Sequence, residues 1–231
     1  VKDACTNRGG RIRARVAAIK TLASGICIGS GGSVGREGPI VQIGASMGSA
    51  LGQRFGLRGA DLVDFVAAGS AAGIAATFNA PIAGVVFAVE VILGRGSPRH
   101  FGPLVVASVT ATAITHAHLG KSPAFAVPAY TLQSGWELPL YVLLGLLAGL
   151  VGVAFTRGLY LLEDLWEKLP GPPYLHTPVG GLLVGALALH FPQLLGVGYE
   201  LIEGVLGVAE HGRLALDQGS LQLSLLALIA L

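Results

Sequence analysis

The stretch GSGGSVGREGPIVQIGASMG occupies residues 29–48, and the interpretation of the whole chain depends on it. A glycine-dense loop leads to an Arg-Glu pair, then to Gly38-Pro39, then to an apolar run. Proline is favoured at the first helical position, because its missing N–H would have no intrahelical partner there. The pattern therefore predicts that a helix begins at Gly38-Pro39.

A helix that begins at this point offers backbone groups to an anion. The first amides of a helix have no intrahelical partner, and the helix dipole adds partial positive charge beside them. Glycines in the same stretch let the backbone approach a ligand, because they have no Cβ. The predicted anion-binding positions are Gly35, Arg36, Glu37, Gly38 and Ile40.

Glu37 is the candidate gating residue, because its carboxylate is tethered beside a site built for an anion. An ionisable residue inside a membrane segment is costly to bury and marks a functional position. Ionised Glu37 competes with the anion, whereas protonated Glu37 loses that attraction and swings away. The alternative is a glutamate that only favours the helix dipole. Arg36 either attracts anions to the site or extends its charge to water.

The composition excludes an ordinary soluble globule. Of the 231 residues 52% are hydrophobic and 12% are charged, whereas soluble proteins average about 25% charged residues. Glycine occurs 35 times, about double its usual share, which is typical of closely packed membrane helices. The basic cluster in residues 1–15 predicts a cytoplasmic segment, and nothing beyond it supports nucleic-acid binding.

Apolar runs predict an all-α polytopic membrane protein with short, broken helices. Small residues spaced by three or four predict tight helix contacts. They are Gly44, Gly48 and Gly52 on one helix, Gly69 and Gly73 on the next, and Gly145, Gly149 and Gly152 on a later one. Helices broken at membrane depth line cavities and point to transport sites. The expected helices cover 16–29, 39–51, 60–77, 81–93, 104–119, 138–162 and 179–191, followed by an amphipathic piece at 200–209 and an unfinished helix at 221–231.

Two blocks of this sequence resemble the signature of the CLC chloride channel and transporter family. They are GREGP at 35–39, between GSGG and IVQIGASMG, and NAPIAG at 79–84. The resemblance implies a CLC-type inverted-repeat fold of broken, tilted helices, present only in part, because the family's GSGIP-type and GxFxP-type loops are absent. Residues 1–231 are then one transmembrane domain incomplete at both ends. Residues 1–119 form most of the first repeat, and 137–231 begin the second.

The resemblance also implies a function. It implies transport of chloride or a similar small anion across a lipid bilayer by a homodimer, with Glu37 as the gating glutamate. Proton-coupled exchangers of the family carry a second glutamate after the NAPIAG-type block, and Val91 stands at that position here, directly after Glu90. This departure favours a passive channel over a chloride/proton exchanger. A non-transporting membrane fragment is the third hypothesis.

An enzyme is not supported, because the chain has no H-E-x-x-H, G-x-S-x-G or Walker motif. His116 and His118 are two residues apart and face different sides of a helix, and the remaining histidines are isolated in the sequence. Cys5 and Cys27 have neither metal-site nor disulfide-framework spacing. We therefore predict no cofactor, no metal and no nucleic-acid partner, and a multi-pass protein of a bacterial inner membrane.

Overall fold

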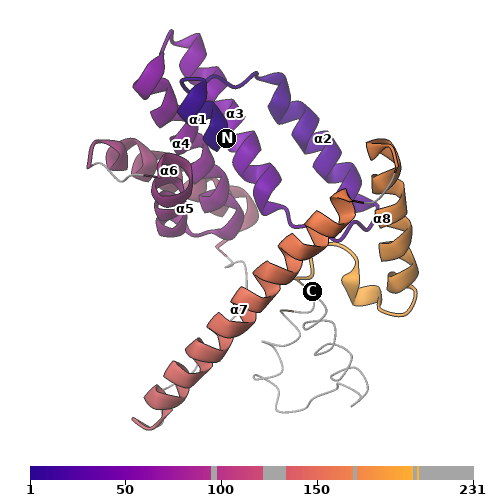
Figure 1. Ribbon diagram of the computed structural model, residues 1–231. Coiled ribbons are helices and arrows are strands. Elements are labelled where there is room, and N and C mark those ends of the chain that lie inside the picture. Colours follow the sequence, from indigo (N-terminus) through magenta and orange to yellow (C-terminus); the bar gives the residue numbers. More distant parts are fainter. Residues whose placement is uncertain (95–97, 122–133, 169–170, 200–201, 203–231) are drawn as a thin grey trace. The chain divides into compact units, whose positions relative to one another are not determined.

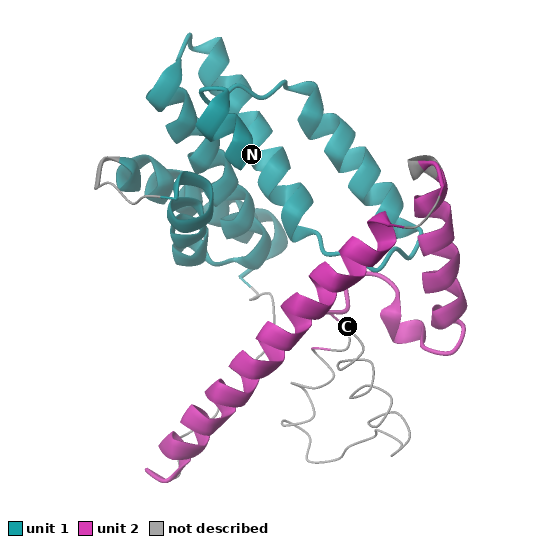
Figure 2. Cartoon of the chain, viewed as in Figure 1, with its two compact units in different colours: residues 1–126 teal, residues 127–231 magenta. Residues whose placement is uncertain are grey.

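The computed structural model describes residues 1–94, 98–121, 134–168, 171–199 and 202, and these residues form helices without any strand (Figure 1). The chain divides into two compact units, residues 1–126 and 127–231 (Figure 2). The helices of the first unit are α1 (Lys2–Asn7), α2 (Arg15–Gly29), α3 (Glu37–Arg54), α4 (Gly59–Phe78), α5 (Pro81–Phe87), the π-helix η1 (Ala88–Leu93) and α6 (Pro98–Leu119). The second unit contains α7 (Glu137–Glu167), α8 (Pro173–Ala188) and the 3₁₀-helix η2 (Pro192–Leu194).

All seven expected helices are present, but several begin earlier than predicted. α6 begins at Pro98 and contains Pro103, and α8 begins at Pro173 and contains Pro178. Each internal proline is the sixth residue of its helix, so it removes one hydrogen bond near the helix start and leaves the rest of the helix intact. A helix at Lys2–Asn7 was not predicted. The predicted piece at 200–209, apart from Ile202, and the one at 221–231 lie outside the described residues.

α4 lies at the centre of the first unit and packs against α3, α5, α6 and η1. Its contact with α3 is made by glycines. A Cβ added to Gly44 or Gly69 would collide with the backbone carbonyl of the other residue, and a Cβ on Gly48 would collide with the carbonyl of Phe65. The glycine faces predicted on these two helices therefore pack against each other, as expected for helices that approach closely.

The core of the first unit is built from small side chains. Leu62, Leu104 and Val66 are the largest wholly buried hydrophobic residues, and Ser46, Ser49, Ser70 and Ser108 are also wholly buried. Small residues bring the helix backbones close, so dispersion contacts between backbones replace contacts between large side chains. The central hydrophobic cluster comprises Val41, Ala67, Ala71, Ile74, Val85, Ala88, Ile92 and Leu104.

The turn between α4 and α5 falls in the predicted gap between the helices at 60–77 and 81–93. Asn79 adopts the left-handed conformation, with φ of 55°. The Ala80 amide donates to the Ala75 carbonyl over 3.1 Å, which is the capping bond of a Schellman motif. Pro81 then occupies the first position of α5, where its missing N–H has no intrahelical partner. Gly84 brings α5 onto α4, because a Cβ there would lie 2.5 Å from the Ala71 carbonyl oxygen.

The second unit contrasts with the first in burial. No residue of the 31-residue α7 is buried, and its leucines and valines are exposed. A Cβ on Gly145, Gly149 or Gly152 would meet nothing within 4 Å among the described residues, so the structure does not show the packing contacts predicted for them. α7 and α4 are the two described helices that are long and apolar enough to cross a membrane.

Candidate anion site

The glycine-rich loop before α3 is the C-terminal cap of α2. Gly31 is left-handed, with φ of 88°. Its amide donates to the Ile28 carbonyl over 3.0 Å, and the Gly32 amide donates to the Cys27 carbonyl over 2.9 Å. These two bonds define a Schellman motif, in which glycine adopts the left-handed position without a steric penalty. The motif ends α2 and turns the chain toward the start of α3.

α3 begins at Glu37, with Arg36 as its N-cap residue, and not at Gly38-Pro39 as predicted. Pro39 is therefore the third helical residue, a position that also lacks an intrahelical N–H partner and so tolerates proline. The Ile40 amide donates to the Arg36 carbonyl over 3.1 Å. The expectation that the Ile40 amide is available to an anion is thus wrong, because that amide forms the first hydrogen bond of the helix.

Glu37 and the two nearby glycines define the geometry at the start of α3. A Cβ on Gly35 would collide with the Glu37 carboxylate, so this carboxylate folds back over the loop that precedes the helix. Among the described residues, a Cβ at Gly38 would meet nothing within 4 Å, so these residues leave that side of the first turn open. Arg36 and Glu37 are both half-buried. An acidic group in the first turn is stabilised by the helix dipole, and any anion that approaches Gly38 meets the same positive end.

Glu90 and Val91 lie in η1, a π-helix that the sequence did not predict. A π-helix has a wider turn than an α-helix and often occurs at functional positions. The sequence predicts one helix over residues 81–93, whereas the structure divides this stretch into α5 and the π-helix η1. Both side chains are exposed among the described residues.

Two histidines have polar partners in the structure that the sequence did not indicate. His100 Nδ1 lies 2.5 Å from Asp64 Oδ1, which joins the start of α6 to the first half of α4. His116 Nε2 contacts Asn79 Oδ1, the residue that ends α4. The partners are 36 positions apart in the first pair and 37 in the second, so no local sequence pattern reveals these contacts. Within the described ranges, no group of three or more His, Cys, Asp or Glu side chains could hold a metal ion.

A family model described as "Voltage gated chloride channel" matches residues 1–231, which is the whole chain. The chain belongs to this family. It is 40% identical over 197 residues to the chloride channel protein CLC-e of Arabidopsis thaliana. This alignment covers 80% of the chain and 28% of the plant protein. It is 34% identical over 196 residues to the H⁺/Cl⁻ exchange transporter ClcA of Vibrio cholerae. This second alignment covers 81% of the chain and 42% of the bacterial protein.

The fold of this CLC chain also matches a solved structure. The crystal structure of a slow cyanobacterial Cl⁻/H⁺ antiporter aligns with a TM-score of 0.78 and 27% identity, over 95% of the chain and 51% of that protein. The predicted CLC fold, present in part, is therefore confirmed. The chain spans about half of that structure and less than half of the two curated relatives.

Proposed function

We propose that this CLC chain forms part of a chloride pathway in which the start of α3 binds the anion. The observation that carries the proposal is the arrangement at this helix start. The Glu37 carboxylate folds back over Gly35 while the adjacent Gly38 faces open space. A helix N-terminus binds anions through its amides and its dipole, so the carboxylate and a chloride ion compete for the same positive region. The anion-binding positions in this proposal are Gly35, Arg36, Glu37 and Gly38.

Competition of this kind makes Glu37 a gate. Ionised Glu37 is attracted to the start of α3 and displaces the anion. Protonation removes its negative charge, so the carboxyl group leaves the helix start and the anion enters. Chloride flux through such a gate rises as the pH falls and as the chloride concentration rises. The half-buried Arg36 next to it adds positive charge and increases the local anion concentration.

We propose a passive channel as the mode of transport. Val91 cannot accept or donate a proton, and it stands at the position where the exchangers of this family carry their second glutamate. Its neighbour Glu90 lies in the exposed turn of η1. The second candidate is a chloride/proton antiporter, which is favoured by the match to the cyanobacterial antiporter structure. The names of the relatives include both channels and an exchanger.

Residues 1–119 and 137–231 are proposed to be most of one inverted repeat and the beginning of the other. The boundary between the two compact units falls between residues 126 and 127 of the chain, inside the segment that separates the proposed repeats. We also propose a homodimer in a bacterial inner membrane. Apolar side chains exposed on α5 and α6, among them Ile82, Val106 and Ile114, support a role of these helices in the dimer contact.

Simultaneous recording of chloride and proton fluxes tests the proposed mode of transport. The complete protein is reconstituted in liposomes with a chloride gradient, and the voltage is clamped near the chloride potential. A channel releases chloride without moving protons against their gradient. Uphill proton movement in a fixed ratio to chloride would replace the channel with the antiporter. No chloride flux from folded, inserted protein would favour the third hypothesis, a membrane protein that does not transport.

A further inference from the structure

The N-terminal segment forms a basic cavity together with side chains of α3. The cavity has a volume of about 570 Å³, and it is lined by α1, by the loop that follows α1 and by Gln42 and Gln53 of α3. Three of its lining residues are arginines, namely Arg8, Arg11 and Arg13. Asp3 is the one carboxylate among the described residues that line it. We propose that this cavity binds the phosphate headgroup of an anionic phospholipid.

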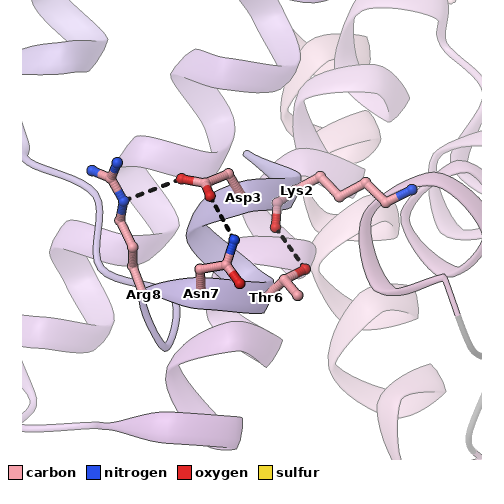
Figure 3. A network of polar contacts seen from close by, with 5 residues as sticks. All are labelled: Lys2, Asp3, Thr6, Asn7 and Arg8. Atoms are coloured by element: carbon pink, nitrogen blue, oxygen red, sulfur yellow. Dashed lines mark hydrogen bonds and ion pairs between the residues drawn. The ribbon is translucent and has the colours of Figure 1, made fainter.

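The cavity is lined by more positive than negative side chains. Arg8 Nε pairs with Asp3 Oδ2 over 3.1 Å, and Asp3 Oδ1 accepts a hydrogen bond from Asn7 (Figure 3). Within the part of the chain that the structure describes, Arg11 and Arg13 form no ion pair with a carboxylate, and both are exposed. Two guanidinium groups therefore remain available to a ligand. Guanidinium groups bind phosphate oxygens through paired hydrogen bonds.

The loop that carries Arg11 is held firmly against α3. The wholly buried Ser49 donates a hydrogen bond from Oγ to the Gly10 carbonyl over 2.6 Å and accepts one from the Ile12 amide over 2.9 Å. Gln53 Nε2 donates to the Ile12 carbonyl over 2.9 Å. These bonds fix the backbone on both sides of Arg11 before any ligand arrives. A fixed backbone lowers the entropy lost on binding.

Gly10 strengthens this arrangement because no other residue fits its position. It is left-handed, with φ of 81°, and a Cβ there would lie 2.9 Å from the Val63 backbone nitrogen. The loop is thus attached to α4 through Gly10 and to α3 through Ser49. Such attachment distinguishes the cavity from a solvated basic tail, whose arginines would sample many positions.

The helix that follows the loop indicates a lipid and not a soluble anion. α2 begins at Arg15, two residues after Arg13, and none of its residues is buried. Its apolar side chains Ile19, Leu22 and Ile26 are exposed, so acyl chains can lie along them while a headgroup occupies the cavity. Basic pockets at the cytoplasmic end of membrane helices bind anionic headgroups, and each nearby Lys or Arg strengthens this attraction.

The test uses the complete protein purified in a neutral detergent, with soluble short-chain lipids as probes. The melting temperature is measured against increasing dioctanoyl phosphatidylglycerol, dioctanoyl phosphatidylcholine and inorganic phosphate, since a ligand that binds the folded state raises it. We expect stabilisation by the phosphatidylglycerol at concentrations at which the phosphatidylcholine and phosphate have no effect. Equal stabilisation by phosphatidylcholine would overturn the proposal, and equal stabilisation by phosphate would replace the lipid with a soluble anion.

Charge variants locate the binding site. The double variant Arg11→Gln/Arg13→Gln should bind phosphatidylglycerol about 30-fold more weakly, because each arginine near an anionic headgroup contributes roughly fivefold. The control Arg15→Gln/Lys20→Gln removes the same charge from residues outside the cavity lining and should change the affinity by less than about twofold. Equal losses in the two variants would show a general charge effect and contradict a defined site.

A third variant changes the affinity in the opposite direction, so misfolding cannot imitate its effect. Asp3→Asn removes the carboxylate from the cavity and releases Arg8, and it should tighten phosphatidylglycerol binding by about fivefold. Unchanged or weaker binding by a folded Asp3→Asn protein would overturn the proposal. The lipid site does not depend on the chloride pathway, so Glu37→Gln should bind the lipid as the unmodified protein does.

Discussion

The starts of α3 and α5 each follow a Schellman cap, but their surroundings are opposite. Both helices follow a Schellman cap, at Gly31 for α2 and at Asn79 for α4. In α3 the early glycine, Gly38, faces open space. In α5 the early glycine, Gly84, lies against α4, where a Cβ would be 2.5 Å from the Ala71 carbonyl oxygen.

The glycines of the two family motifs serve different purposes. Gly84 is required by packing, because the helix behind it leaves no room for a side chain. Gly38 is not required by any packing contact with the described residues, which fits the proposal that it leaves the helix start accessible to an anion. A glycine that packing does not explain, placed beside a tethered carboxylate, supports an anion site at α3. The same substitution at the two glycines should therefore have opposite effects on stability.

Gly84→Ala should have the largest effect on stability. Its Cβ would lie 2.5 Å from the Ala71 carbonyl oxygen and 3.0 Å from the Ala75 Cβ, so α5 must move away from α4. Overpacking of this kind costs about 1–3 kcal/mol. We expect a clearly lower melting temperature of the complete protein in detergent. A melting temperature equal to that of the unmodified protein would mean that α5 and α4 do not pack as the structure shows.

Asn79→Ala should have an intermediate effect. The left-handed conformation at this position costs a residue with a Cβ about 1–2 kcal/mol, and asparagine tolerates it better than alanine does. Asn79→Gly is the matched control, because glycine adopts the same conformation freely and also lacks the side-chain contact with His116. The melting temperature should fall more in Asn79→Ala than in Asn79→Gly. The reverse order would show that the His116 contact outweighs the backbone conformation.

Gly38→Ala should have the smallest effect on stability, with the opposite sign. Replacing glycine by alanine in an unobstructed helical position stabilises by about 0.5–1 kcal/mol. The added methyl group narrows the approach to the start of α3, so chloride flux in liposomes should fall while the melting temperature stays equal or rises. A loss of stability comparable to that of Gly84→Ala would remove the contrast between the two helix starts.

The sequence predicted the features that depend on local chemistry. The α4–α5 break at Asn79-Ala80-Pro81 and the glycine faces of α3 and α4 follow from capping, proline geometry and residue size, and the structure confirms them. The helix start at Gly38-Pro39 was one residue late, because proline tolerates any position in the first turn. The prediction that the Ile40 amide binds an anion was wrong, because the earlier helix start makes this amide the donor of the first hydrogen bond of the helix.

Other features could not be predicted because they depend on contacts distant in the sequence or on small energy differences. The pairs His100–Asp64 and His116–Asn79 join α6 to α4 and its end. The π-helix Ala88–Leu93 has the same apolar composition as an α-helix, so its sequence does not distinguish the two. The basic cavity arises because Ser49 and Gln53 bind a loop some 40 residues earlier in the chain, and only the number of arginines was visible in the sequence.

The pH dependence of chloride efflux in Glu37→Gln tests the central claim most directly. The complete protein and the variant are compared in liposomes between about pH 4 and 8, which brackets the usual pKa of a glutamate, with Gly38→Ala as a control that keeps the carboxylate. Efflux should rise as the pH falls in the unmodified protein and in Gly38→Ala. In Glu37→Gln it should be high at every pH, because glutamine carries no negative charge to compete with chloride. A variant with the pH dependence of the unmodified protein would contradict Glu37 as the gate.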